Sequence, residues 1–365
     1  VCIFAAYVRI YHDKGLIRPI FINLNERIMN VSEFDGYENE LSVALKAVRL
    51  ACRATANVQK SLKQNSIDTK VDRSPVTVAD YASQAIIIRH LSENFDGDLL
   101  MVAEEEASHL KSKQNVTLLE GVVEAVNEVS GRLETTELLE AIDLGNHDAS
   151  SDKFWTLDPI DGTKGFIRGQ QYAVSLALIE DGQVILGVLG CPNLSNDYQK
   201  PFNEGDAVGG MYFAVKDCGA WATTCDTNTE KSKLAASQNK PFAELRACES
   251  VEPSHSMIGH SERILQSIGV ISLPFRLDSQ CKYAVVARGQ ADIYLRIPTD
   301  KNYEEKIWDH AAGAIIAEEA GALVTDIRGN KLDFHCGPTL KRNEGIACSA
   351  VSAHTSLIKS IQDYL

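Results

Sequence analysis

The spacing of apolar residues divides the chain into helices and strands. Hydrophobic side chains that recur every three to four residues predict amphipathic helices, and short apolar runs between Gly, Pro, Asp and Asn clusters predict strands. Helices are predicted at residues 37–65, from about 80 to 91, 118–129, 137–142, 261–268, 280–288, 309–319 and from 356 to the C-terminus. Strands are predicted at 99–103, 154–157, 172–179, 184–189, 211–215, 220–223, 245–248, 275–277, 292–297, 323–325 and 346–348.

The order of these elements differs between the two halves of the chain. The strands between residues 154 and 223 follow one another, and Asp181-Gly182 indicates a hairpin turn. Beyond residue 245, strands and helices alternate, which favours an α/β layer. With 365 residues and a polar stretch at 226–233, we expect two domains. They are an α+β domain at 37–230 and an α/β domain at 231–365, after an N-terminal extension of residues 1–36.

The composition restricts the class of partner. The net charge is −14, and such a surface repels a nucleic-acid backbone, so the expected ligand is a small molecule. No apolar run is long enough to cross a membrane. Nine scattered cysteines without a C-x-x-C pair favour a reducing compartment and mostly buried thiols, although Cys218 and Cys225 are close enough in sequence to pair if oxidised.

The first 28 residues fit neither a secretory signal nor a good transit peptide. They are net basic and contain no serine, and the first methionine of the chain is Met29. We expect Met29 to be the native start, with an organellar leader for chloroplast or mitochondrion as the alternative. The expected location is the cytoplasm.

The first candidate for chemistry is the hexamer Asp158-Pro159-Ile160-Asp161-Gly162-Thr163, where a predicted strand ends. Two carboxylates three residues apart around a turn can face one point, with the Ile160 carbonyl between them. Mg²⁺ prefers such hard oxygen ligands and commonly also binds substrate phosphate. Gly162 and Thr163 offer backbone N–H groups to a phosphate. Taken alone, the hexamer is more often a surface turn.

Two further acids change this interpretation. Glu104 lies at the end of an apolar strand, and Asp309 lies at the start of a predicted helix. Singly, Glu104 fits a solvated strand end and Asp309 fits a helix N-cap. Together with Asp158 and Asp161 they indicate a divalent-cation site, because none has a basic partner nearby in sequence.

The complete set resembles the signature of the lithium-sensitive, magnesium-dependent phosphatase superfamily that includes the inositol monophosphatases. Within it, the chain is similar to plant-type 3′(2′),5′-bisphosphate nucleotidases from about Glu38 to the C-terminus. The stretches with this similarity are 74–81, 158–169, 277–283, 294–298 and 305–310. Departures are Pro253, an inserted residue before His260, and Cys281 in place of an alanine.

The resemblance implies a role for each matching residue. The implied ligands of two or three Mg²⁺ ions are Glu104, Asp158, the Ile160 carbonyl, Asp161 and Asp309. Asp80 and Thr163 are implied as the pair that orients and deprotonates the attacking water. The implied substrate contacts are Gly162, Thr163, His255, Ser279, Lys282, Arg296 and Asp309.

The resemblance also implies a fold and a reaction. The fold is a layered αβαβα arrangement of α/β and α+β parts. The reaction is removal of the 3′-phosphate from adenosine 3′,5′-bisphosphate to give AMP, and from its sulfated analogue, with sensitivity to lithium. Lys282 and Arg296 suit the phosphate that is not hydrolysed. The alternatives are an inositol polyphosphate 1-phosphatase and a catalytically inactive nucleotide or metal sensor. We expect a monomer.

Overall fold

The described part of the chain consists of nine α-helices, two main sheets and short 3₁₀ turns. The computed structural model describes residues 34–365 except Asp35, 66–74, Asp96, Asp98, Asn203, 227–229, 253–257 and Lys301. The helices are α1 Glu38–Asn65, α2 Pro75–Asn94, α3 Val116–Ser130, α4 Thr135–Asp143, α5 Thr163–Ile167, α6 Ile258–Ser267, α7 Cys281–Ala287, α8 Ala311–Glu319 and α9 Val351–Tyr364. The strands are β1 Met101–Ala103, β2 Lys153–Asp161, β3 Ala173–Glu180, β4 Gln183–Cys191, β5 Gly210–Val215, β6 Ala220–Thr224, β7 Ser232–Lys233, β8 Ala247–Glu249, β9 Phe275–Arg276, β10 Ile293–Arg296, β11 Ala322–Thr325 and β12 Ile346–Ala350.

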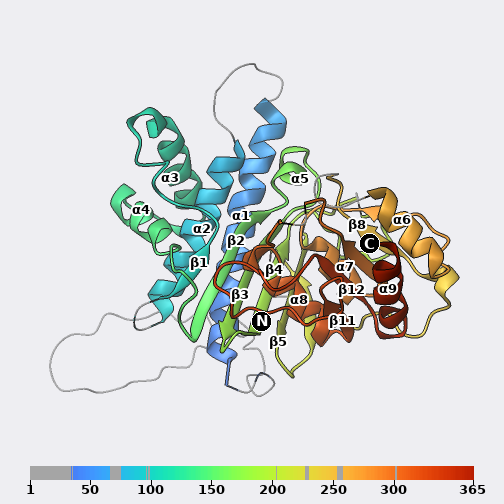
Figure 1. The fold of residues 1–365 in the computed structure, drawn as a ribbon. Helices are drawn as coiled ribbons and strands as arrows, with labels where there is room; N and C mark the ends of the chain where they lie inside the picture. Colours follow the sequence, from blue (N-terminus) through green and yellow to red (C-terminus); the bar gives the residue numbers. More distant parts are fainter. Residues whose placement is uncertain are drawn as a thin grey trace, which may run out of the picture. The chain divides into compact units, whose positions relative to one another are not determined.

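These elements form five alternating layers, which confirms the predicted αβαβα arrangement (Figure 1). Helices α1 and α2 pack together and cover one face of the first sheet, where α1 contacts β3 and β4. Helices α7 and α8 form the middle layer, since α8 contacts β3 to β6 and α7 contacts β10 and β12 of the second sheet. Helices α6 and α9 pack together, and α9 covers the second sheet at β11 and β12.

The first sheet has the order β1-β2-β3-β4-β5-β6-β7, and only its β1–β2 pair is parallel. In that pair Ala103 lies opposite Leu157, so Glu104 and Asp158 follow at the same edge of the sheet. The second sheet has the order β11-β12-β10-β8-β9. Strand β10 of this second sheet ends at Arg296, so Arg296 reaches the site from the second sheet.

Helix α8 can lie between two sheets because its residues are small. Residues Ala311 to Ala317 are all buried, as expected for a helix that is covered on every side. A Cβ atom at Gly187 of β4 would lie 2.9 Å from the Ala312 backbone, and a Cβ atom at Gly313 would lie 2.2 Å from the Tyr283 ring. Glycine at both positions therefore allows α8 to approach β4 on one side and α7 on the other.

Two predicted boundaries near the site are wrong. Strand β2 does not end at Leu157 but continues through Asp158-Pro159 to Asp161, with an irregular register opposite β3. This irregularity accommodates a proline that lacks the N–H for regular pairing. The predicted start of helix α8 at Asp309 is also wrong, because a 3₁₀ turn, η5 Ile307–Asp309, precedes it and His310 is its N-cap. Asp309 is therefore not an N-cap, and its carboxylate remains available for the site.

Three other boundaries differ from the predictions. Helix α2 begins at Pro75, a residue that is favoured in the first turn of a helix, rather than near Asp80. Helix α9 begins at Val351 rather than Ser356. The polar stretch predicted as a connection contains strand β7, Ser232–Lys233, the edge strand of the first sheet. The change from first to second sheet therefore lies beyond Lys233, and the division of domains at residues 230–231 stays a prediction.

Two predictions concern residues outside the described part of the chain. The proposed start at Met29 and the contact at His255 lie outside the described residues.

Among the described helices, none is long and apolar enough to cross a membrane. Most described cysteines are buried, as predicted, at 52, 191, 225, 248, 281 and 348. Cys218 and Cys225 are not joined by a disulfide bond.

Candidate active site

The Asp-Pro turn at the end of β2 is held by its own side chain and by α2. Asp158 Oδ1 accepts a hydrogen bond from the Ile160 N–H at 3.0 Å, across Pro159. Ser83 Oγ of α2 donates to the Pro159 carbonyl at 2.9 Å. The side chain of Ile160 is buried at 1% exposure, which anchors the centre of the turn. Asp158 and Asp161 are thus fixed on either side of a rigid three-residue step.

Gly162 joins the turn to helix α5 and lies against the second half of the chain. Its φ of 88° is in the left-handed region, and a Cβ atom there would lie 2.8 Å from Ser279 Cβ. Glycine is required on both counts. The preceding Asp161 carboxylate accepts a hydrogen bond from the Gln280 N–H. Ser279 has a φ of 66°, so both sides of this close contact adopt left-handed backbone.

Three carboxylates from two distant parts of the chain meet at this point. Asp158, Asp161 and Asp309 each offer an oxygen atom, and these atoms lie within 4.8 Å of one another. Asp309 is held through its neighbour Trp308, whose carbonyl accepts from Gln280 Nε2 at 2.8 Å and from Ser175 Oγ at 3.2 Å. The structure therefore brings together the three acids that the sequence predicts as metal ligands.

Glu104 completes the acidic wall from strand β1. The amide of Gln84 fixes the chain beside it, since it donates to the Glu105 carbonyl at 2.7 Å and accepts from the Glu105 N–H at 3.1 Å. Glu104 itself keeps exposed surface because it faces the open cavity. The surrounding protein and the charge of Asp309 raise its pKa to about 8.

The electrostatics of this cluster favour a bound cation. Burial and the charge of Asp309 raise the pKa of Asp161 to about 6, although Lys282 acts in the opposite direction. Burial, followed by the charge of Glu104, raises the pKa of Asp158 well above its usual range. Carboxylates at this separation repel one another strongly when ionised. Divalent cations relieve that repulsion, and a set of carboxylate oxygens is the donor type that Mg²⁺ prefers.

The acidic wall faces two cationic side chains across a cavity of about 290 Å³. Lys282 is 3% exposed, and its Nζ donates to the carbonyls of Ser279 at 2.7 Å and Leu277 at 3.1 Å. Burial lowers the pKa of Lys282, while the charge of Asp161 acts to raise it. Arg296 lines the same cavity from the end of β10. A cavity with acids on one wall and cations on the other suits an anion that is bound through metal ions on one side.

The sequence and fold of this chain match one known family. The family model described as the inositol monophosphatase family matches residues 38–365. The chain belongs to the inositol monophosphatase family. It is 42% identical over 348 residues to a 3′(2′),5′-bisphosphate nucleotidase of Oryza sativa, which covers 92% of this chain and 97% of the rice protein. It is 40% identical over 341 residues to 3′,5′-bisphosphate nucleotidase 2 of Arabidopsis thaliana, with 90% and 97% covered.

Solved structures of the inositol monophosphatase family share the fold. The crystal structure of CysQ from Bacteroides thetaiotaomicron, a bacterial family member, superposes with a TM-score of 0.58 at 20% sequence identity. The match covers 86% of this chain and 98% of that protein. The layered arrangement is thus the fold of this family.

The predicted catalytic pair of this family member is not joined directly. Thr163 Oγ1 donates to the Ile160 carbonyl at 3.4 Å, and no hydrogen bond links it to Asp80 in the described residues. Asp80, on α2, is 6% exposed, and burial together with the charges of Glu105 and Glu104 raises its pKa. Thr163 lines the cavity, whereas Asp80 lies behind the acidic wall. The roles of both residues stay predictions.

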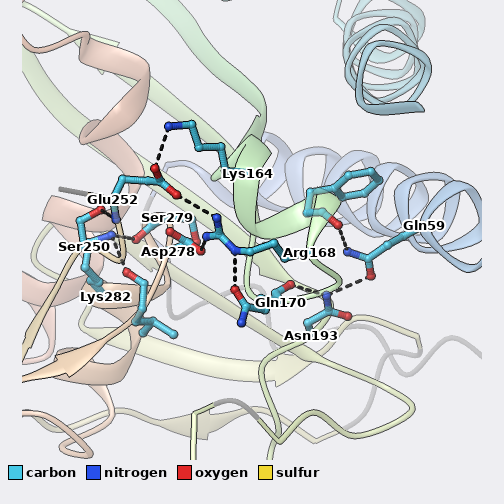
Figure 2. A network of polar contacts seen from close by, with 12 residues as sticks. Gln59, Lys164, Arg168, Gln170, Asn193, Ser250, Glu252, Asp278, Ser279 and Lys282 are labelled. Carbon is cyan, nitrogen blue, oxygen red and sulfur yellow. Dashed lines mark hydrogen bonds and ion pairs between the residues drawn. The ribbon is translucent and has the colours of Figure 1, made fainter. Parts of the chain in front are cut away.

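A second polar cluster lies at the rim of the cavity, at helix α5 (Figure 2). The Glu252 carboxylate bridges two cations, with Lys164 Nζ at 2.7 Å and Arg168 Nη1 at 2.8 Å. Arg168 Nη2 also pairs with Asp278 at 2.5 Å. These pairs balance two positive charges with two negative ones and tie α5 to the part of the chain beside Ser279.

Sequence reasoning assigned no role to several residues of the site. Those in the cavity wall are Lys164, Ser250, Glu252, Asp278, Gln280, Tyr294 and Tyr303. Glu305, whose carboxylate binds Arg296, was also missed. The signal for Glu305 was an acid four residues before Asp309, in the same motif. Its partners are far away in sequence, and only the fold reveals them.

Proposed function

We propose that this protein is a magnesium-dependent phosphomonoesterase that removes the 3′(2′)-phosphate of adenosine 3′,5′-bisphosphate to give AMP, and acts on the sulfated analogue. The observation that supports this most strongly is the cluster of Asp158, Asp161 and Asp309 opposite Lys282 and Arg296 in one cavity. Relatives at about 40% identity over nearly the whole chain are named 3′(2′),5′-bisphosphate nucleotidases.

The residues present fit a divalent metal centre. Asp158, Asp161, Asp309, Glu104 and the Ile160 carbonyl supply hard oxygen atoms at one wall of the cavity. When bound, Mg²⁺ would neutralise the phosphate and activate water at this wall. The raised pKa values of Glu104 and Asp161 indicate that ionising this cluster without a cation is electrostatically costly, which is expected of a site that binds cations.

The chain itself supplies the remaining functions of a phosphatase site. We assign to Thr163 the positioning of the attacking water, because Thr163 lines the cavity at the start of α5, two residues after Asp161. Asp80 is the acceptor for the proton in this assignment, since burial and the charges of Glu105 and Glu104 raise its pKa and make it a stronger base than an ordinary carboxylate. Ser279, Lys282 and Arg296 receive the second phosphate, the one that is not hydrolysed.

The function is tested by phosphate release from a small panel of substrates. The panel contains adenosine 3′,5′-bisphosphate, its sulfated analogue, adenosine 3′-monophosphate, inositol 1,4-bisphosphate and inositol monophosphate. We expect the highest kcat/KM on the two bisphosphorylated nucleotides, with activity that requires Mg²⁺ and falls with Li⁺. A preference for inositol 1,4-bisphosphate would support the inositol polyphosphate 1-phosphatase instead.

Three properties stay predictions: the monomeric state, the compartment and the contact at His255. Light scattering tests the monomeric state by measuring the mass in solution. The variant His255→Ala tests the contact, with an expected rise of KM for nucleotides and no change for inositol phosphates.

A further inference from the structure

A chain of buried polar contacts leads from the cavity into the middle layer of helices. Arg296 Nε donates to Glu305 Oε1 at 2.8 Å. Glu305 Oε2 pairs with His310 Nε2 at 3.1 Å, and His310 Nδ1 pairs with the Tyr283 hydroxyl at 3.0 Å. The side chains of Glu305 and His310 are 2% and 1% exposed. The contacts therefore link the end of β10, the start of α8 and helix α7 without access to bulk water.

Glu305, Asp309 and His310 lie close enough together to suggest a second metal site. The hydrogen bonds exclude this interpretation for His310, because both of its ring nitrogens already have partners in Glu305 and Tyr283. A metal ion requires a free lone pair on one of these nitrogens. Each oxygen of Glu305 likewise has one partner. The arrangement is that of a positioning network rather than a metal site.

Arg296 needs a buried counter-charge in order to remain at the cavity wall. Its side chain is 12% exposed, and the nearby Lys282 carries a like charge that disfavours a second cation. Glu305 supplies the compensating charge. Burial acts to lower the pKa of Arg296, but Glu305, together with Tyr294 and Asp309, outweighs this and raises the pKa above its usual range. Without Glu305 a buried guanidinium would pay an uncompensated desolvation cost and would be expected to turn away.

The geometry of the pair leaves part of the guanidinium for a ligand. Glu305 binds the Nε atom, and Tyr303, whose side chain also pairs with Arg296, lies with its ring 5.9 Å from the guanidinium carbon. The two Nη atoms of an arginine form a planar edge that matches two oxygens of a phosphate. Fixing Nε from one side therefore sets the direction of the Nη edge. Because Glu305 is itself held by His310 and Tyr283, that direction is set by the rigid middle layer.

We propose that Glu305, held by His310 and Tyr283, is a positioning residue that orients Arg296 toward the second phosphate of the substrate and thereby favours bisphosphorylated over monophosphorylated substrates. This inference rests on the proposed function, in which Arg296 receives the phosphate that is not hydrolysed. It assigns no direct substrate contact to Glu305. Its effect should therefore appear in KM for bisphosphates rather than in kcat.

The test is the variant Glu305→Gln, which keeps the shape and a hydrogen-bond acceptor but removes the charge. We expect KM for adenosine 3′,5′-bisphosphate to rise about tenfold, with KM for adenosine 3′-monophosphate and kcat on both substrates changed less than about twofold. The matched control is Glu304→Gln. Glu304 is exposed, pairs with Thr339 at 2.7 Å, and should have no effect on either substrate.

A double-mutant cycle shows whether Glu305 acts through Arg296. In an Arg296→Met background, Glu305→Gln should cause no further rise of KM for the bisphosphate. An undiminished rise in that background, or an equal rise for mono- and bisphosphates, would overturn the proposal. Should Glu305→Gln fold poorly, Tyr283→Phe loosens the same network, and about a threefold rise of KM on the bisphosphate alone is expected.

The comparison of mono- and bisphosphorylated substrates also distinguishes a failure of this inference from a failure of the proposed function. If the wild-type protein prefers inositol phosphates, the nucleotide assignment fails. The positioning role is then measured with inositol 1,4-bisphosphate against inositol monophosphate. A selective loss on the bisphosphate supports the role of Glu305, and an equal loss on both refutes it.

Discussion

The acids that line the cavity and the acid that holds Arg296 have opposite environments. On the wall of the first sheet, Glu104 and Asp161 lie among other acids, and burial with the charge of Asp309 raises their pKa values to about 8 and about 6. Glu305, which pairs with Arg296 at the end of β10, is 1% exposed and is therefore buried more deeply than Glu104. Burial acts to raise its pKa, but His310 and Arg296 lower it to about 2. The same chemical group is thus destabilised as an anion at the cavity wall and stabilised beside Arg296.

The direction of the pKa shift distinguishes acids that are suited to bind cations from acids that stabilise the fold through ion pairs. Asp292, paired with Lys240 at 2.8 Å and Arg246 at 3.1 Å, is a second example of the paired type. Its pKa lies below the usual range although burial acts to raise it. Clusters of unpaired acids are costly in the folded state and are typical of functional sites. The comparison predicts opposite consequences for activity and stability when acids of the two kinds are replaced.

The largest expected effect is that of Asp158→Asn. Loss of a ligand carboxylate removes stabilisation of transition-state charge, so kcat should fall by about 10³-fold or more. In metal-free buffer the variant should be at least as resistant to heat as the wild type, because one repelling charge is gone. Phosphate release measures the fall of kcat, and thermal denaturation in EDTA measures the resistance to heat. An undiminished rate would favour a different site for the chemistry.

The matched control for Asp158 is a paired acid far from the cavity. Asp333 is hydrogen-bonded by the His335 backbone and pairs with Arg342 at 2.9 Å, and its pKa is about 2. Asp333→Asn should leave kcat unchanged and should slightly lower the melting temperature. Replacing aspartate with asparagine would then lower activity without a loss of stability at Asp158, and lower stability without a loss of activity at Asp333.

Next in size is Thr163→Ala. If Thr163 orients the attacking water with Asp80, kcat should fall by about 10² to 10⁴-fold. Thr163→Ser retains the hydroxyl and is the matched control, for which less than about a tenfold loss is expected. An equal loss in both variants would place the role of Thr163 in its backbone or its methyl group instead of its hydroxyl.

The sequence was sufficient to predict the layers, the acidic wall and the cations opposite it, and insufficient to predict the polar network that holds Arg296. Periodicity identified α1, and the motifs around Asp158 and Asp309 identified acids that meet within 4.8 Å. These features are local in sequence, because each acid lies at or near the end of an element. The contacts of Glu305 with Arg296 and His310 depend on the packing of α7 against β10 and α8.

The irregular course of the chain at the site was the other feature that periodicity missed. Strand β2 continues past Pro159 because the irregular register opposite β3 and the Asp158–Ile160 hydrogen bond replace regular pairing. The η5 turn before α8 similarly breaks helical spacing at Asp309. Functional residues therefore lie where local patterns are interrupted, and propensity rules place element boundaries poorly at such points.

A smaller effect is expected from the pH dependence of metal stabilisation. Protons occupy the raised-pKa acids Glu104 and Asp161 in the folded state, so without metal the free energy of unfolding should fall as pH rises from about 5 to about 8. Metal binding requires the deprotonated carboxylates. Excess Mg²⁺ should therefore raise the melting temperature more at about pH 8 than at about pH 6, by about 5 °C at the higher pH. Equal shifts at both pH values would argue against these acids as ligands, and Asp158→Asn serves as the control.

The smallest effect comes from the paired acid, with the opposite sign. The pKa of Glu305 is about 2 in the folded protein against a usual value of 4.5, so its ion pairs stabilise the fold above about pH 4.5 and lose that contribution as pH falls toward 2. Urea unfolding of wild type and Glu305→Gln should differ most near pH 6. The difference should shrink by on the order of 2 kcal/mol near pH 3. Glu304→Gln, the exposed control, should follow the wild type at both pH values. A constant difference between wild type and Glu305→Gln would mean that Glu305 contributes through its shape rather than its charge, and the contrast between the two kinds of acid would then be one of packing.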